Sequence, residues 1–116
     1  VPPTLFADLP PDSRLLHEEI FGPVGVLLPF DDEAQAVRIA NDTPYGLAAG
    51  LWTRDIARAH RVARLLQAGQ VYVNEYPGGG IETPFGGYKA SGIGREKGRE
   101  ALHHYTQLKT VIVNLG

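Results

Sequence analysis

The chain contains no cysteine, and this absence removes several kinds of chemistry from it. Without thiols, these 116 residues supply no disulfide framework, no thiolate nucleophile and no cysteine ligand for a metal. Methionine is absent as well, and the chain starts abruptly at Val1. Any reaction that needs a sulfur nucleophile must therefore obtain it from other sequence.

A basic excess is also lacking. Eleven Lys and Arg residues oppose thirteen Asp and Glu residues, and the net charge is −2 at pH 7. Because nucleic-acid grooves and surfaces for anionic membranes need clustered positive charge, we expect neither partner. No apolar run reaches the roughly 18 residues of a membrane span, and the N-terminus lacks the layout of a signal peptide. We therefore expect a cytoplasmic protein.

Length and pattern predict one α/β domain. The chain has 116 residues, 43% of them hydrophobic, which is enough for one core. Apolar runs alternate with helical periodicity, so we expect strand, helix, strand, helix, strand at residues 24–28, 31–41, 47–53, 57–68 and 70–76, with Gly69 as a helix C-cap. This order predicts a βαβαβ parallel-sheet unit that binds ligands at the carboxyl ends of its strands.

A further helix is expected at residues 95–105, followed by a C-terminal strand at residues 108–116. This last segment is rich in valine and isoleucine and has no later sequence to pair with. An unpaired strand of this kind joins either its own sheet or that of a second subunit, and the pattern leaves both options open.

The most informative stretch is residues 84–98 (PFGGYKASGIGREKG). Five glycines lie between Gly86 and Gly98, which indicates a loop with close backbone approach. A dinucleotide fingerprint needs G-x-G-x-x-G, but three residues separate Gly94 from Gly98. A phosphate loop needs Lys followed by Ser or Thr, but Ala90 follows Lys89. Neither motif explains the stretch.

The stretch resembles the C-terminal signature of the aldehyde dehydrogenase superfamily. Three other segments agree with that family in order and spacing: residues 18–24 (EEIFGPV), 41–50 (NDTPYGLAAG) and 73–74 (VN). The resemblance implies that residues 1–107 are the C-terminal part of the catalytic domain. It implies that residues 108–116 help to join subunits into a homo-oligomer.

The same resemblance implies an activity. Enzymes of this family oxidise an aldehyde to a carboxylic acid with NAD or NADP, through a thioester formed on a cysteine. Because this chain has no cysteine, we expect it to be the C-terminal portion of a longer enzyme and to be inactive alone. The alternative is a non-catalytic binding or assembly module that keeps the family's half-sheet.

Glu19 and Phe21 are the cofactor residues that the resemblance implies. Glu19 matches the glutamate that binds both ribose hydroxyls on the nicotinamide side, and Phe21 matches an aromatic residue beside the nicotinamide. One carboxylate offers two acceptor oxygens to a vicinal diol, which suits this role. Taken as residue types alone, Glu19 is more typical of a solvated acid and Phe21 of a core aromatic. The unit Glu-Ile-Phe-Gly-Pro at residues 19–23 favours the cofactor roles instead.

Glu96 is the candidate catalytic carboxylate. The resemblance matches it to a glutamate that forms a proton relay with an upstream lysine in some family members. The alternative is a structural acid near the start of the predicted helix, where negative charge is favoured.

Phe85 and the loop at residues 78–83, including Gly79, would line the aldehyde pocket. Relatives that act on betaine aldehyde tend to have Trp at the place of Phe85, so we disfavour that substrate. Lys89 and Gly92 match positions whose backbone carbonyls hold potassium in some relatives. The four histidines have neither zinc-site spacing nor cysteine partners, so we expect no transition metal.

Overall fold

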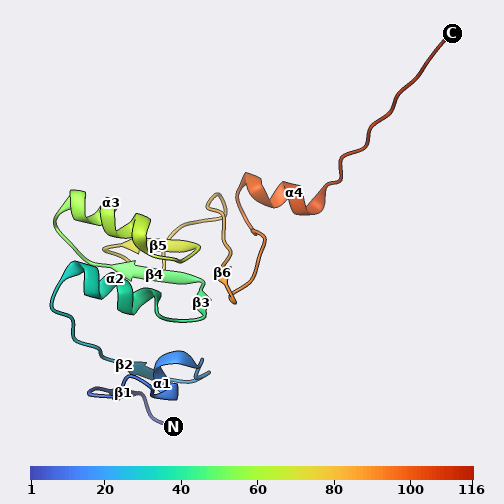
Figure 1. Cartoon of the computed structure of the whole chain (residues 1–116). Coiled ribbons are helices and arrows are strands. Elements are labelled where there is room, and N and C mark those ends of the chain that lie inside the picture. Colours follow the sequence, from blue (N-terminus) through green and yellow to red (C-terminus); the bar gives the residue numbers. More distant parts are fainter.

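The computed structural model describes residues 1–116 and shows short strands and helices along an elongated chain (Figure 1). The strands are β1 (Thr4–Phe6), β2 (Val24–Val26), β3 (Tyr45–Gly46), β4 (Ala48–Leu51), β5 (Gln70–Val73) and β6 (Tyr88–Lys89). The helices are α1 (Arg14–His17), α2 (Glu33–Asn41), α3 (Ile56–Leu65), a 3₁₀ turn at Arg99–Ala101 and α4 (Leu102–Tyr105). The mixture of helices and parallel strands confirms the predicted α/β class.

The strands form three separate pairs rather than one sheet. β1 pairs with β2 and β4 pairs with β5, both in parallel, while β3 pairs antiparallel with β6. The predicted βαβαβ unit is therefore correct only for its second crossover, β4–α3–β5. Its first strand pairs instead with β1, which lies in the apolar run after the two N-terminal prolines. Periodicity identifies strands but does not say which strands are neighbours.

Aspartate caps set the starts of the two longer helices. Asp32 accepts a hydrogen bond from the Gln35 N–H (2.7 Å), and Asp55 accepts from the N–H groups of Ala57 and Arg58. Such oxygens satisfy backbone donors that the first helical turn leaves without partners. The start predicted at residue 31 is thus two residues too early, since α2 begins at Glu33.

The predicted C-cap at Gly69 is wrong. α3 ends at Leu65, and Leu66 ends it in an extended conformation. Gly69 serves a different purpose, because a Cβ atom there would collide with the Gly86 carbonyl oxygen. The missing side chain thus lets the glycine-rich loop approach the start of β5.

The helix predicted at residues 95–105 is also shorter than expected. Glu96 forms an isolated antiparallel bridge with Phe85, and both Lys97 and Gly98 have φ of +58°. Left-handed residues cannot belong to a right-handed helix, so helical structure begins only at Arg99.

The predicted C-terminal strand does not form within this chain. Residues 106–116 are extended, carry no strand partner and project away from α4 (Figure 1). Their apolar side chains Val111, Ile112, Val113 and Leu115 are exposed. Of the two pairing options, the one with the chain's own sheet is therefore not realised.

The chain has almost no core of its own. Only three residues are buried, and Ala59, which is 4% exposed, is the only hydrophobic residue among them. The radius of gyration is 19.4 Å, against about 13 Å for a compact domain of this length. The expectation of one self-contained core is wrong, because the apolar faces point outward. None of the helices combines the length and apolar character that crossing a membrane requires.

Candidate functional site

A side-chain clasp marks the carboxyl end of β5. The Asn74 amide accepts a hydrogen bond from the Thr53 N–H (2.8 Å) and donates one to the Thr53 carbonyl (2.9 Å). Asn74 itself has φ of +59°, a left-handed conformation that asparagine tolerates better than most residues. The amide thus extends the β4–β5 pairing by one step while the backbone turns into the loop at residues 75–83.

The glycine-rich loop folds back on itself and places Phe85 opposite Glu96. Each residue donates its N–H to the carbonyl of the other, and both bonds are 2.7 Å long. Glu96 therefore lies in a paired extended segment, three residues before the first helical turn. Glu96 thus does not belong to the first helical turn, although it lies near the start of the helix. Its carboxylate forms no ion pair.

Arg95 anchors the same loop through both its backbone and its side chain. Its guanidinium donates to the carbonyl oxygens of Gly87 (3.1 Å) and Gly94 (2.7 Å) and lies 5.6 Å from the centre of the Tyr88 ring. Its backbone N–H donates to Nε2 of His104 (3.1 Å). Phe85, Glu96 and His104 line one hollow of about 390 Å³.

Lys89 has a structural contact that the potassium hypothesis did not anticipate. Its ammonium donates to the carbonyls of Asn41 (2.8 Å) and Thr43 (3.1 Å), at the C-terminal end of α2. Its own carbonyl accepts a hydrogen bond from the Gly92 N–H (3.3 Å). No cluster of His, Asp and Glu side chains suited to a metal ion occurs in the chain. The backbone potassium site stays a prediction.

Glu19 lines a second hollow, of about 530 Å³, between the N-terminal segment and the glycine loop. Polar side chains of Thr43, Tyr45 and Ser91 line it too. The neighbouring Glu18 is engaged by Arg14, whose guanidinium donates two hydrogen bonds of 2.7 Å and lowers the pKa of the Glu18 carboxyl. Glu19 has no such partner. Phe21, 98% exposed, does not line this hollow.

Gly79 lines a third hollow, of about 250 Å³, with Thr83, Pro84 and residues of β5. The Gln70 amide donates to the Pro84 carbonyl (3.0 Å) and so joins this loop to the strand. The predicted site residues are thus divided among separate hollows. The 116 residues bring Phe85 together with Glu96, but not with Glu19 or Gly79.

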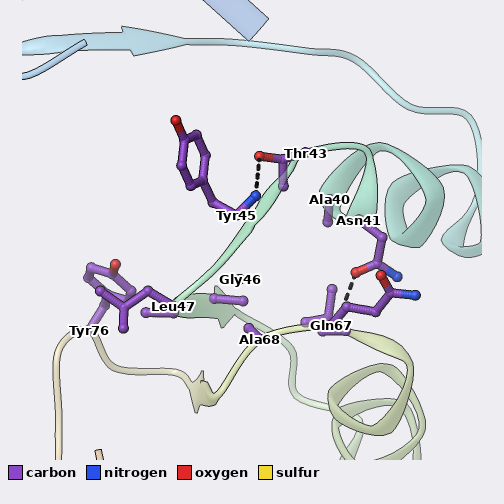
Figure 2. A pocket seen from close by; sticks show the side chains of 12 residues that line it. Ala40, Asn41, Thr43, Tyr45, Gly46, Leu47, Gln67, Ala68 and Tyr76 are labelled. Atoms are coloured by element: carbon purple, nitrogen blue, oxygen red, sulfur yellow. Dashed lines mark hydrogen bonds between the residues drawn. The ribbon is translucent and has the colours of Figure 1, made fainter. Parts of the chain in front are cut away.

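A further cavity, of about 240 Å³, lies where the ends of α2 and α3 meet β4 (Figure 2). The Asn41 amide accepts from the Gln67 N–H and donates to the Leu65 carbonyl, each at 2.8 Å, and closes one side of it. Its lining is mostly apolar and carries no Asp, Glu, His, Lys or Arg. It therefore offers no charged side chain, and its ionisable groups are the hydroxyls of Tyr45 and Tyr76.

Comparison with known proteins decides the family. The model of the aldehyde dehydrogenase family matches residues 1–111, which is nearly the whole chain. The chain belongs to the aldehyde dehydrogenase family. The resemblance read from the four sequence segments is thereby confirmed.

Similar aldehyde dehydrogenases occur in bacteria and animals. The chain is 53% identical over 113 residues to the NADP/NAD-dependent aldehyde dehydrogenase PuuC of Escherichia coli K12, covering 97% of this chain and 23% of that protein. It is 53% identical to 4-trimethylaminobutyraldehyde dehydrogenase A of Danio rerio over all 116 residues, again 23% of that protein. The chain thus spans about a quarter of the length of these curated relatives.

Solved aldehyde dehydrogenase structures share its fold. An NAD⁺ complex from Bacillus cereus has a TM-score of 0.91 at 51% identity, covering 98% of this chain and 23% of that one. A P. syringae indole-3-acetaldehyde dehydrogenase mutant in complex with NAD⁺ and IAA has a TM-score of 0.90 at 50% identity, covering 97% and 23%. The α/β arrangement is therefore that of the aldehyde dehydrogenases.

The sequence alone assigns no role to two residues that make well-defined contacts. Asn74 lies in one of the family segments, and its amide bonds to Thr53, which is 21 residues away in the chain. His104 was considered only as a metal ligand. Its contact with Arg95 depends on the helical turn at residues 102–105. No sequence pattern predicts that this turn packs against the loop.

Proposed function

We propose that this chain is part of the catalytic domain of an NAD(P)-dependent aldehyde dehydrogenase. The complete enzyme would oxidise an aldehyde to a carboxylic acid through a thioester on a cysteine outside these 116 residues. The observation that carries this proposal is the similarity of the fold, at TM-scores near 0.9 and about half sequence identity, to aldehyde dehydrogenases solved with NAD⁺. The bound nucleotide would accept hydride from the substrate.

Glu19 suits the ribose-binding role that the family resemblance implies, because its carboxylate is free to accept hydrogen bonds. Glu18 and Glu19 both line the hollow, but the Glu19 carboxylate has no cationic partner, whereas Glu18 is paired with Arg14. Two carboxylate oxygens free to accept hydrogen bonds match the two hydroxyls of a ribose. Thr43, Tyr45 and Ser91 offer further hydroxyl groups in the same hollow. Anchoring the sugar here would restrict where the nicotinamide lies, with Phe21 at its side.

Phe85 and Glu96 form the second part of the proposal. The paired backbone at this point holds an apolar ring and a carboxylate side by side. The ring would exclude water from the reacting aldehyde, and the carboxylate would pass protons out of the site. Gly79, in the loop that Asn74 starts, would leave room for the substrate. The cytoplasmic location stays a prediction, which cell fractionation would test.

The proposal is tested by Glu19→Gln in the complete enzyme. We expect single-turnover formation of NAD(P)H to slow by on the order of 10- to 100-fold, because a loosely held ribose misplaces the hydride acceptor. Affinity for the nucleotide should fall only modestly. Glu18→Gln is the matched control and should leave the hydride step unchanged. An unaltered single-turnover rate in Glu19→Gln would refute the assignment.

The isolated chain should produce no NAD(P)H from any aldehyde, because it has no cysteine nucleophile. The exposed segment at residues 106–116 would pair with a strand of a second subunit in the complete enzyme.

A further inference from the structure

Hydrogen bonds from neighbouring residues support the Phe85–Glu96 pair, and the proposed reaction assigns no role to them. Both residues lie at the ends of a loop whose turns are rich in glycine, so their alignment needs bonds from outside the pair. On the Phe85 side, the Gln70 amide of β5 holds the Pro84 carbonyl (3.0 Å), and on the Glu96 side the bonds belong to Arg95, directly before Glu96 in sequence. Its guanidinium contacts only the same loop, at Gly87 and Gly94.

The backbone N–H of Arg95 is the link to another element. It donates to Nε2 of His104 at 3.1 Å, and this is the only hydrogen bond between α4 and residues 84–98. The imidazole also covers the open face of Gly94, because a Cβ atom built there would lie 3.4 Å from its Cε1 atom. His104 therefore holds the loop immediately beside the residue that pairs with Phe85.

We propose that His104 is a positioning residue, which keeps Phe85 and Glu96 aligned through Arg95 only while its Nε2 atom carries no proton. An amide N–H can only donate, so Nε2 must accept, and the neutral ring then has its proton on Nδ1. A doubly protonated ring has no free lone pair and cannot make this bond. Acidification would release the Arg95 amide and loosen the segment.

Charged and titratable groups from the loop and from α4 face the ring. Arg95 and Glu96 from the loop and the neighbouring Tyr105 share the hollow with His104. Histidine is the side chain that ordinarily changes charge between about pH 5 and 8. The experiment therefore compares two pH values within that range.

Hydrogen exchange on the complete enzyme tests the inference without relying on activity. Peptides covering residues 84–98 should exchange roughly three- to tenfold faster at pH 5.5 than at pH 7.5, after correction for the intrinsic pH dependence of exchange. His104→Gln should remove this difference, because its side-chain carbonyl accepts a hydrogen bond at either pH. His104→Ala should exchange fast at both.

His103→Gln is the matched control. The His103 side chain makes no hydrogen bond in the structure, so this variant should keep the pH dependence of the wild type. Circular dichroism would show that each variant is folded. Equal exchange of the wild type at both pH values, or unchanged pH dependence in His104→Gln, would overturn the proposal.

A kinetic readout, which rests on the proposed function, separates the two hypotheses. His104→Gln should flatten the acidic limb of the pH profile of KM for aldehyde more than that of kcat, since Phe85 shapes the pocket. If the complete enzyme oxidised no aldehyde, the proposed function would fail while the exchange experiment still judged His104.

Discussion

At the scale of single residues, bonds between distant parts of the chain position the loops. Three hydrogen bonds join residues more than twenty positions apart in the chain: Asn74 with Thr53, Asn41 with Gln67, and Lys89 with Asn41. Short-range patterns cannot predict such pairs, because the same asparagine or lysine is equally compatible with a solvated turn. Family resemblance marked the segments that contain them, but the bonds are visible only in the fold.

One ion-pair cluster at this scale has a pH-dependent effect. The Glu33 carboxylate accepts two hydrogen bonds from Arg61 (2.6 and 2.8 Å) and lies 3.3 Å from Arg58, so α2 is joined to α3. The hydrogen bond with Arg61 is the main cause that lowers the pKa of Glu33 below its ordinary 4.5, with the charges of both arginines adding to it. Partial desolvation opposes the shift.

We expect Glu33→Gln to lower the urea midpoint of the complete enzyme slightly at pH 7. A carboxyl with a depressed pKa in the folded state stabilises above its unfolded pKa and loses that contribution as the pH falls through the folded value. The difference from wild type should therefore shrink as the pH falls below the ordinary glutamate value and vanish once the pH lies below the depressed pKa of Glu33. Glu18→Gln, which breaks a pair inside α1 alone, is the control. A difference that persisted unchanged at pH 3 would contradict the account.

At the scale of elements, sequence reasoning was most successful where one segment decides its own conformation. β2, β4 and β5 fall within the predicted strands, and α2 and α3 begin within two residues of their predicted starts at residues 31 and 57. Pairing was harder, since β2 could not be assigned to β1 from periodicity. The helix at residues 95–105 failed because the pairing of Glu96 with Phe85 competes with it.

The capping aspartate of α2 offers a test at this scale. Asp32→Ala should destabilise the protein by about 0.5–2 kcal/mol, because the Gln35 N–H loses its acceptor. Asp31→Ala is the matched control, since the Asp31 side chain makes no cap and its removal should matter little. Urea unfolding of the complete enzyme would measure both. Equal losses in the two variants would show that charge near the helix, rather than the cap, is responsible.

At the scale of the whole molecule, the chain exposes the apolar surface that a domain normally covers. Phe21, Phe30, Trp52 and Ile81 are all more than half exposed, together with the segment at residues 106–116. Composition predicts a core from the number of apolar residues but does not reveal how many of them contact other sequence. The chain spans about a quarter of the length of relatives such as PuuC. Under the proposed function, the rest of the enzyme would cover these apolar surfaces.

Removing residues 106–116 from the complete enzyme should lower its oligomeric state. Exposed backbone and branched apolar side chains favour strand addition to another subunit, and deletion removes both. Light scattering after gel filtration would measure the mass. Replacing Lys109 by Gln, which leaves the backbone intact, is the control and should keep the native mass. A deletion variant that kept the native mass would contradict this role.

No hydrogen bond joins residues 1–30 to residues 32–116. Glu19 and the glycine-rich loop at residues 84–98 therefore lie on two segments that both line one hollow without being bonded to each other. A nucleotide seated in that hollow would touch both segments and act as a bridge between them. Ligand that binds only the assembled arrangement raises the unfolding temperature with its concentration. The unfolding temperature of the complete enzyme should thus rise with the nucleotide concentration. In a cell with little nucleotide, the enzyme would unfold at a lower temperature.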